Sequence, residues 1–260
     1  MSSIKKIKNI RNLKRKIVCL TAYSKPLAKI LDKYCDIILM GDSVATAFYG
    51  MKNTREIKLD TMINHAISVR KSIKKSLLVF DMPFNTYKNI KEAKKNIKKV
   101  LLKTNCDAIK LESNGKNFKI LKTLTNSGIK VMGHIGYTPQ YKKYFSPQGL
   151  KNKEEIKLIN EAKSIEDAGA FAIVLECINA DLAKKITKNL KIPTIGIGSS
   201  KYCDGQILVL DDLIGLSGFY PKFVKKYISL EKILNKVIKK FRNDVIRNNF
   251  PKVSNTYKIK

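Results

Sequence analysis

The feature that most constrains the fold is the alternation of short apolar runs with segments of helical periodicity. Eight runs are rich in Ile, Val and Leu and have the length of a strand; they cover residues 16–21, 36–41, 76–81, 107–112, 128–134, 170–176, 192–198 and 206–211. Continuous apolar runs of this length are typical of parallel strands, because such strands are buried on both faces. The runs therefore predict a parallel sheet covered by helices.

Most of the segments between these runs have the spacing of amphipathic helices. Residues 88–103 and 152–168 carry apolar side chains every three or four positions, as the buried face of a helix requires. Residues 181–189 predict a short helix with Asp181 as its N-cap. Eight strand–helix units in about 250 residues predict a (β/α)8 barrel of the TIM type. A doubly wound open sheet is the alternative, although no glycine-rich phosphate turn follows the first run.

We expect residues 1–260 to form a single barrel domain with additions at both ends. Residues 1–16 are basic, and Ile4, Ile7 and Ile10 recur at helical spacing, which favours an N-terminal helix that caps the barrel over a transit peptide. Residues from about 231 to 260 predict a C-terminal helix and a tail.

Charge, hydropathy and cysteine content limit the class of protein. The net charge of +31 comes almost entirely from Lys scattered along the chain, with no block of Arg and aromatic residues, so we expect solvated helix faces and no nucleic-acid partner. No apolar stretch reaches the roughly 18 residues of a membrane span, so no membrane partner is expected. The five cysteines contain no C-x-x-C pair, which favours reduced thiols and a cytoplasmic location.

Polar side chains end five consecutive strand-like runs. They are Asp42, Asp81, Lys110, Glu112, His134 and Glu176. In a barrel, the C-terminal ends of the strands surround one mouth, so these side chains are expected to converge there. One such acid alone is more often a helix cap, but several converging carboxylates repel one another unless a cation lies between them.

The residue types favour a hard divalent cation at this mouth. Mg²⁺ prefers oxygen ligands and usually takes only one or two protein carboxylates. Zinc is poorly supported, because the chain has only His65 and His134 and no cysteine pair. The residues thus predict a metal-dependent barrel enzyme that acts on an anionic, oxygen-rich substrate.

A set of segments in a fixed order resembles the ketopantoate hydroxymethyltransferase family. These segments cover residues 20–23, 40–43, 80–84, 109–112, 131–140, 169–177, 192–198 and 203–210. Each segment alone is a modest match, but the ordered set is specific, and the resemblance extends over roughly residues 4–230. It implies a (β/α)8 barrel and a place in pantothenate and coenzyme A synthesis.

The resemblance also implies a reaction and roles for residues. The reaction transfers a hydroxymethyl group from 5,10-methylenetetrahydrofolate to 3-methyl-2-oxobutanoate through a Mg²⁺-stabilised enolate, giving 2-dehydropantoate. The implied roles are metal binding for Asp42, Asp81 and Glu112, substrate binding for Asp42, Ser43, Asp81 and Lys110, proton abstraction for Glu176, and a place at the same mouth for His134. Family members commonly form homo-oligomers, often decamers.

Three loops depart from the family pattern, at residues 141–149, 198–200 and 211–212. The departures concern folate contacts and loop mobility rather than the strand-end acids.

Two other functions remain as alternatives. One is an enolate-forming barrel enzyme of the phosphoenolpyruvate mutase and isocitrate lyase type, whose Lys-Lys-Cys-Gly-His loop is not found here. The other is a basic binding protein without catalysis.

Overall fold

A computed structural model describes residues 6, 7, 9, 10, 12–218 and 220–257. Eight parallel strands close into a barrel in sequence order, with β1 paired to β8, so the predicted (β/α)8 fold is confirmed. The strands are β1 (Ile17–Thr21), β2 (Ile37–Met40), β3 (Leu77–Asp81), β4 (Ala108–Glu112), β5 (Val131–Gly136), β6 (Ala172–Glu176), β7 (Thr194–Ile197) and β8 (Gly205–Leu208). Each of the eight apolar runs thus overlaps one strand, although β5 ends two residues after its run and β8 begins one residue before its run.

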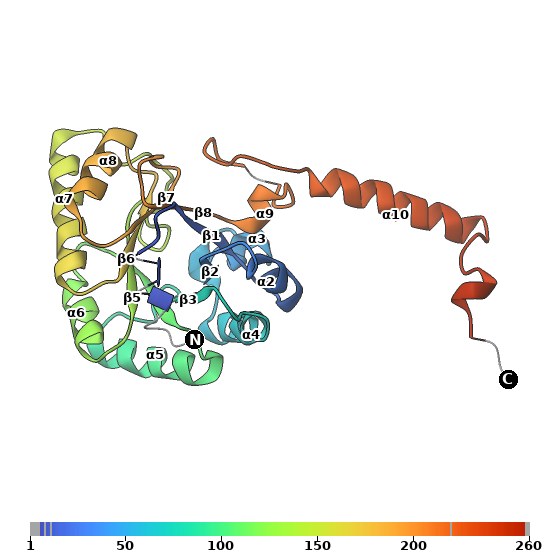
Figure 1. The fold of residues 1–260 in the computed structure, drawn as a ribbon, viewed down its shortest axis with the longest axis horizontal. Helices are drawn as coiled ribbons and strands as arrows, with labels where there is room; N and C mark the ends of the chain where they lie inside the picture. Colours follow the sequence, from blue (N-terminus) through green and yellow to red (C-terminus); the bar gives the residue numbers. More distant parts are fainter. Residues whose placement is uncertain (1–5, 8, 11, 219, 258–260) are drawn as a thin grey trace.

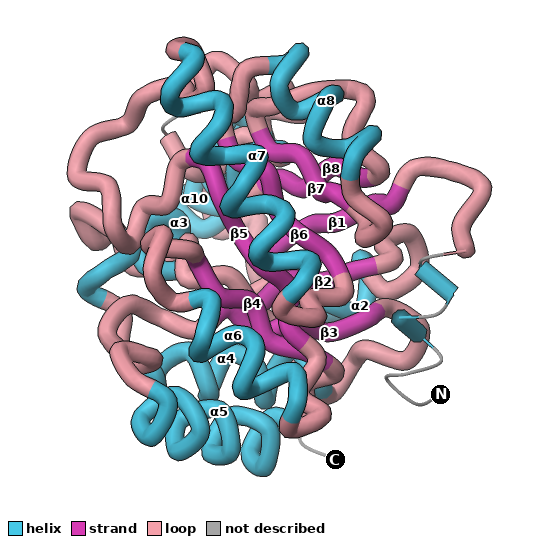
Figure 2. Tube along the Cα trace, turned by 90° about the vertical axis from the view of Figure 1, so that its left-hand side faces the viewer, coloured by secondary structure: helices cyan, strands magenta, loops and turns pink. Residues whose placement is uncertain are grey.

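Helices surround the barrel on most of its circumference (Figures 1 and 2). They are α2 (Lys25–Leu31), α3 (Val44–Ala47), α4 (Leu59–Arg70), α5 (Ile90–Thr104), α6 (Phe118–Asn126), α7 (Asn152–Asp167), α8 (Ala180–Asn189), α9 (Leu210–Leu213) and α10 (Leu230–Ile246), with short 3-10 turns η1 (Thr54–Glu56) and η2 (Val253–Asn255). None of the helices in the described ranges is long and apolar enough to cross a membrane.

The helix ends follow local capping chemistry. Asn89 accepts a hydrogen bond from the Glu92 backbone N–H and begins α5. The predicted N-cap of α8 is wrong: Asn179, not Asp181, accepts hydrogen bonds from the first turn of this helix. Asp181 instead lies inside that turn, where a carboxylate interacts favourably with the helix dipole.

Two apolar cores follow from the two faces of each strand. Side chains that point into the barrel, such as Ile37, Leu77 and Val79, form an inner cluster. The alternate side chains, such as Ile38 and Phe80, pack against the surrounding helices. This alternation is the two-residue period of a strand, and it decides which polar residues face the mouth.

The N-terminal segment closes the end of the barrel opposite that mouth. Lys6, Ile7, Asn9 and Ile10 are helical, and both isoleucines join the inner cluster. The Lys6 ammonium is buried, donating to the Ser76 carbonyl at 2.8 Å and to Asp107 at 3.0 Å. Ile4 and the rest of residues 1–5 lie outside the described part, as do residues 8 and 11.

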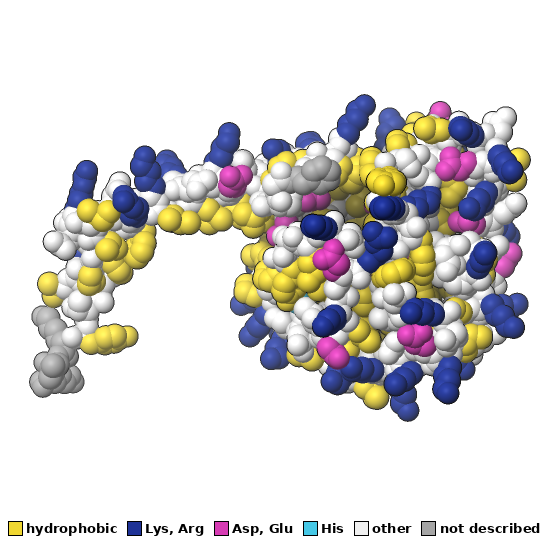
Figure 3. Space-filling view, turned by 180° about the vertical axis from the view of Figure 1, so that it is seen from behind, with side chains coloured by type: hydrophobic (Ala, Val, Ile, Leu, Met, Phe, Trp, Pro, Cys, Tyr) yellow, Lys and Arg dark blue, Asp and Glu magenta, His cyan; other side chains and the backbone are white. Residues whose placement is uncertain are grey.

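The C-terminal helix α10 leaves the barrel and projects as an arm (Figure 1). None of its residues is buried. A continuous apolar stripe runs along one side of the arm, and Lys and Arg lie on the other (Figure 3). The same view shows basic side chains dispersed over this face of the barrel rather than gathered in one patch.

Candidate active site

The predicted site residues lie at the C-terminal end of the barrel because of the strand period. On β4, Ile109 and Leu111 face the helices, so Lys110 and Glu112 face inward. The register places Asp81 beside Lys110 and Glu112 beside His134 on neighbouring strands. All seven predicted residues line one cavity of about 140 Å³: Asp42, Ser43, Asp81, Lys110, Glu112, His134 and Glu176.

Asp81 and Lys110 form a buried ion pair at the floor of the cavity. Lys110 Nζ lies 2.6 Å from Asp81 Oδ2, and both side chains are almost fully buried. The other carboxylate oxygen, Asp81 Oδ1, is buried without a hydrogen-bond partner among the described residues. Such an orphaned acceptor is costly, so it marks the place where a missing donor or cation would bind.

The two aspartates hold their protons unusually strongly. Burial raises the pKa of Asp42 to about 6; Lys110 opposes this shift and Glu112 adds to it. Burial also raises the pKa of Asp81 to about 7, again against Lys110, and the charge of Asp42 raises it further. The negative charges of these two side chains therefore act on each other, and a cation between them would relieve the repulsion.

His134 lies between two glutamates on the other side of the cavity. Its Nδ1 is 3.5 Å from Glu112 Oε1 and its Nε2 is 3.2 Å from Glu176 Oε2, although neither contact has good hydrogen-bond geometry. Burial and Lys110 lower the pKa of His134, but Glu112 and Glu176 raise it more, so that it lies at about 9. His134 therefore carries a proton at neutral pH in the free protein.

The backbone around Glu176 is fixed by close contacts. Gly136 ends β5 with a φ of 99°, and a Cβ there would collide with the Glu176 carbonyl oxygen. That carbonyl accepts a hydrogen bond of 2.8 Å from the Tyr137 N–H. Cys177, the next residue, has a left-handed φ of 53°, which is strained for a side chain of this kind. These constraints fix the backbone from which the Glu176 side chain extends at the rim of the cavity.

Gln140 connects the carboxylates, and the sequence assigned it no role. Its Nε2 donates to Asp42 Oδ2 at 2.9 Å and to the Met82 carbonyl at 3.0 Å. Its backbone N–H donates to Glu112 Oε2 at 3.1 Å, and its Oε1 accepts from the Tyr87 hydroxyl at 2.5 Å. The available signal was its position at the end of the 131–140 segment, in a long loop after a strand.

Two further cavity residues come from the chain after β8. Asp212 and Phe223 both line the cavity. Burial raises the pKa of Asp212, against a hydrogen bond from Ser217. The Phe223 ring packs on Gly198, where an added Cβ would come within 2.7 Å of it. Two of the loops that depart from the family pattern, 198–200 and 211–212, thus meet beside the cavity.

The donor set fits a hard divalent cation with few protein ligands. Asp42 and Asp81 offer carboxylate oxygens, and Asp81 Oδ1 lacks a partner among the described residues. Within the described ranges, no group of three or more His, Cys, Asp or Glu side chains is arranged as a metal cluster. Glu112 already accepts from Gln140 and faces His134. Two carboxylates with room for water and substrate suit Mg²⁺ better than a metal enclosed by protein ligands.

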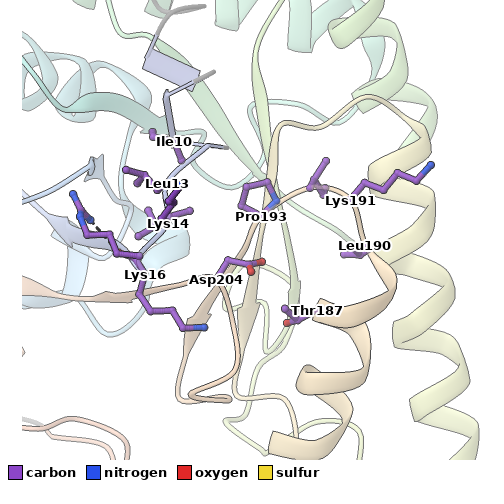
Figure 4. Close-up of a pocket in the computed structure, with 12 residues that line it drawn as sticks. Ile10, Leu13, Lys14, Lys16, Thr187, Leu190, Lys191, Pro193 and Asp204 are labelled. Atoms are coloured by element: carbon purple, nitrogen blue, oxygen red, sulfur yellow. Dashed lines mark hydrogen bonds between the residues drawn. The ribbon is translucent and has the colours of Figure 1, made fainter.

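A larger hollow of about 470 Å³ lies at the opposite end of the barrel (Figure 4). Its polar groups are occupied by structural bonds. Asp204 accepts from the N–H and hydroxyl of Thr194, and Lys16 Nζ donates to the Cys203 carbonyl at 2.6 Å. Barrel enzymes place their chemistry at the other end, and the convergent, unsatisfied acids lie there too.

Proteins of known name are similar to this chain over most of its length. A family model described as ketopantoate hydroxymethyltransferase matches residues 1–253. The 3-methyl-2-oxobutanoate hydroxymethyltransferase of Pelagibacter ubique is 50% identical over 97% of this chain and 99% of its own. The protein of the same name from Anaplasma marginale is 44% identical over 91% of this chain and 86% of its own.

Solved structures with a similar fold come from a different group of enzymes. A phosphonopyruvate hydrolase solved with oxalate and Mg²⁺ has a TM-score of 0.66 at 12% identity, covering 98% of this chain and 93% of its own. A 2,3-dimethylmalate lyase of the phosphoenolpyruvate mutase and isocitrate lyase superfamily has a TM-score of 0.62 at 12% identity, covering 96% and 89%. At such low identity the likeness supports the barrel fold and no particular activity.

Proposed function

This chain belongs to the ketopantoate hydroxymethyltransferase family, and we propose that it transfers a hydroxymethyl group from 5,10-methylenetetrahydrofolate to 3-methyl-2-oxobutanoate, giving 2-dehydropantoate. The observation that supports this best is the small cavity in which Lys110, two aspartates and the Glu112–His134–Glu176 group converge. A small 2-keto acid has one carboxylate and one ketone oxygen to place among them.

We propose Asp42 and Asp81 as the metal ligands, with Glu112 near the ion, and Mg²⁺ as the metal. The orphaned Asp81 Oδ1 and the electrostatic coupling of the two aspartates support this role. Bound there, Mg²⁺ would supply positive charge that favours the developing negative oxygen of the keto acid.

Lys110 and Ser43 are proposed to bind the carboxylate of the keto acid. Lys110 keeps its charge in the buried cavity, because the acids around it raise its pKa in spite of burial. Ser43 Oγ lies 2.8 Å from the Tyr23 hydroxyl, and when Ser43 accepts this hydrogen bond its own proton is free to donate to the substrate. One fixed charge and one oriented hydroxyl are enough to position a small carboxylate.

Glu176 is proposed as the base that takes the proton from C3 of the keto acid. The electron pair of the broken C–H bond then forms the new bond to the one-carbon unit, the C–N bonds of that carbon to the folate break, and water supplies the hydroxyl oxygen of the product. His134 Nε2 lies 3.2 Å from Glu176 Oε2. Glu176 is less buried than the other acids, as a base at the cavity rim must be to reach the substrate.

We further propose a homo-oligomer, with a decamer as the family precedent, and a cytoplasmic location. Five free and buried cysteines suit a reducing compartment.

The proposed function is tested by assaying 2-dehydropantoate formation from 3-methyl-2-oxobutanoate with and without the folate and Mg²⁺. Product formation that requires both the folate and Mg²⁺ supports the proposal. Product formed without the folate rejects the folate as the donor, and product formed without Mg²⁺ rejects the role of the metal.

A further inference from the structure

A side pocket of about 760 Å³ adjoins the cavity proposed for the keto acid. Phe223 lines both spaces. At the end of β6, Glu176 lines the cavity, and the next residue, Cys177, lines the side pocket. At the end of β7, Ile197 and Gly198 divide between the two spaces in the same way. The cavity and the side pocket therefore meet beside Glu176, the proposed base.

The side pocket has the size that the cavity lacks. The cavity measures about 140 Å³, which suits a small keto acid. Sites for larger organic ligands usually enclose about 300–1,000 Å³. The folate is several times larger than the keto acid, so it cannot share the cavity, yet its one-carbon unit must reach the keto acid beside Glu176. A ligand in the side pocket can reach that point, because the two spaces meet there.

Apolar side chains form one part of the side pocket. Phe145, Pro147 and Leu150 come from the long loop after β5, and Phe223 comes from the segment after α9. The Phe145 ring meets the Tyr137 ring edge to face, with centroids 5.2 Å apart, and Phe145 is still 55% exposed. Flat ring systems pack well against such side chains. A folate has two ring systems to place, its pterin and its p-aminobenzoyl group.

Two lysines give the side pocket a positive charge. Lys201 and Lys222 line it, and both are exposed. Lys201 also lies over the Tyr202 ring, with Nζ 5.4 Å from the ring centroid. None of the described residues that line the side pocket is Asp or Glu. The glutamate part of a folate ends in two carboxylates, and two ammonium groups are suitable partners for them.

The wall of the side pocket includes two of the loops that depart from the family pattern. Its lining residues within 145–150 overlap the departing loop at 141–149, and residues 198–200 line it as well. The Ser199 hydroxyl donates to the Ile178 carbonyl at 3.0 Å, which ties the 198–200 loop to the segment after β6. A ligand of this pocket therefore contacts the segments in which this chain differs from the family.

We propose that the side pocket binds 5,10-methylenetetrahydrofolate, with its ring systems against Phe145 and Phe223. The glutamate carboxylates of the folate pair with Lys201 and Lys222. The one-carbon unit then lies where the side pocket meets the cavity, next to Glu176 and the keto acid. This assignment rests on the proposed hydroxymethyl transfer and gives its donor a site.

The test measures affinity directly, by calorimetry under anaerobic conditions. It compares tetrahydrofolate with tetrahydropteroate, which has the same ring systems but no glutamate. In Lys201→Gln/Lys222→Gln, tetrahydrofolate should bind about tenfold more weakly, because two partly exposed charged contacts are lost, and tetrahydropteroate should bind as it does to wild type. In Phe145→Ala, both ligands should bind about 5- to 20-fold more weakly, because a ring contact is lost.

The control for the lysine variant is Lys188→Gln/Lys225→Gln, because both lysines are exposed and neither lines the side pocket. It removes the same charge and should bind both ligands as wild type does. Circular dichroism verifies that each variant is folded. Wild-type affinity for tetrahydrofolate in both test variants would overturn the proposal. An equal loss of affinity for the two ligands in the lysine variant would overturn the glutamate contact.

Formation of 2-dehydropantoate by wild type is assayed separately, so the site and the activity can fail independently. A wild type that binds tetrahydrofolate but forms no product contradicts the proposed activity. An active wild type whose test variants keep full affinity contradicts the side pocket alone. A wild type that binds no tetrahydrofolate contradicts both.

Discussion

At the residue scale, Gln140 holds two carboxylates of the site in fixed positions. Its side-chain amide fixes Asp42 and its backbone N–H fixes Glu112, while the Tyr87 hydroxyl and the Met82 carbonyl hold the amide in one orientation. Carboxylates that repel one another stay in place only when donors hold them. Gln140 therefore prepares two proposed metal-site residues before any ion arrives.

Replacing Gln140 with Leu is expected to weaken Mg²⁺ binding about 10- to 100-fold, as loss of a partner that orients a metal ligand usually does. The measurement is a Mg²⁺ titration by calorimetry, together with the Mg²⁺ dependence of activity. Gln148→Leu is the matched control, because this buried glutamine lies in the same loop but bonds Ser146 and Lys142. Equal Mg²⁺ affinity in Gln140→Leu and wild type would contradict the role.

Glu176→Gln keeps the shape of the side chain but removes its ability to accept a proton. Exchange of the C3 hydrogen of 3-methyl-2-oxobutanoate with deuterated water should fall about 100-fold or more in this variant. Proton NMR measures the exchange without the folate, which isolates the first step. Glu155→Gln, on the surface of α7, is the control. Exchange at the wild-type rate in Glu176→Gln would exclude Glu176 as the base.

The sequence predicts the strand-end acids of the site but not the residues that reach the cavity from loops. Strand-end acids are predictable, because a strand buried on both faces is a continuous apolar run and its polar end is easily seen. The contacts of Gln140 are not, because they form only when the 137–151 loop folds back over the mouth. Asp212 and Phe223 were missed for a similar reason: they enter the cavity from a segment whose path depends on tertiary contacts.

At the scale of elements, single side chains join helices to strands. Asp32, at the C-terminal end of α2, accepts hydrogen bonds from the backbone N–H groups of Lys74, Lys75 and Ser76, which lead into β3. Burial raises the pKa of Asp32, but these hydrogen bonds outweigh it and lower the pKa below its usual value. The Asp32 carboxylate thus joins the end of α2 to the start of β3.

Asp32→Asn is expected to lower the free energy of unfolding by about 1–3 kcal/mol at neutral pH. Because the folded-state pKa is lowered, the contribution is complete above the unfolded value near pH 4 and is lost as the pH falls through the folded value. Urea unfolding at pH 7 and at pH 3.5 measures the difference, with the exposed Asp181→Asn as control. If Asp32→Asn lowers the free energy of unfolding by the same amount at both pH values, the negative charge of Asp32 is not the source of the stabilisation.

The direction of α10 and the uncovered part of the barrel wall were not predictable from the sequence. A C-terminal helix was predictable from its apolar spacing, and α10 has it. Its direction was not, because a helix that packs on another copy carries the same pattern as one that packs on its own barrel. Likewise, the lack of a long helix directly after β8 leaves no positive signal in the sequence; it is seen in the exposure of Val18 on the neighbouring strand β1.

At the scale of the whole molecule, one segment joins the cavity to the projecting helix α10. The chain from α9 to α10 places Phe223 in the cavity wall, and its far end carries the arm. The Tyr227 N–H, donating to the Leu213 carbonyl, holds this segment between them. A contact that holds α10 in the proposed homo-oligomer would therefore also hold this wall of the cavity.

Charge placed on the apolar stripe of α10 is therefore expected to lower both the activity and the molar mass of the proposed homo-oligomer. In Val237→Glu/Phe241→Glu we expect kcat/KM to fall roughly tenfold or more, because displacement of a cavity wall by about an ångström disturbs substrate position. The control Asn235→Glu/Asn243→Glu, which adds the same charge to the polar side of α10, should keep wild-type activity and mass. Wild-type specific activity should also fall when the protein is diluted below the concentration at which light scattering shows dissociation. A monomeric arm variant with full kcat/KM would show that the cavity wall is fixed within one chain and that assembly serves another purpose.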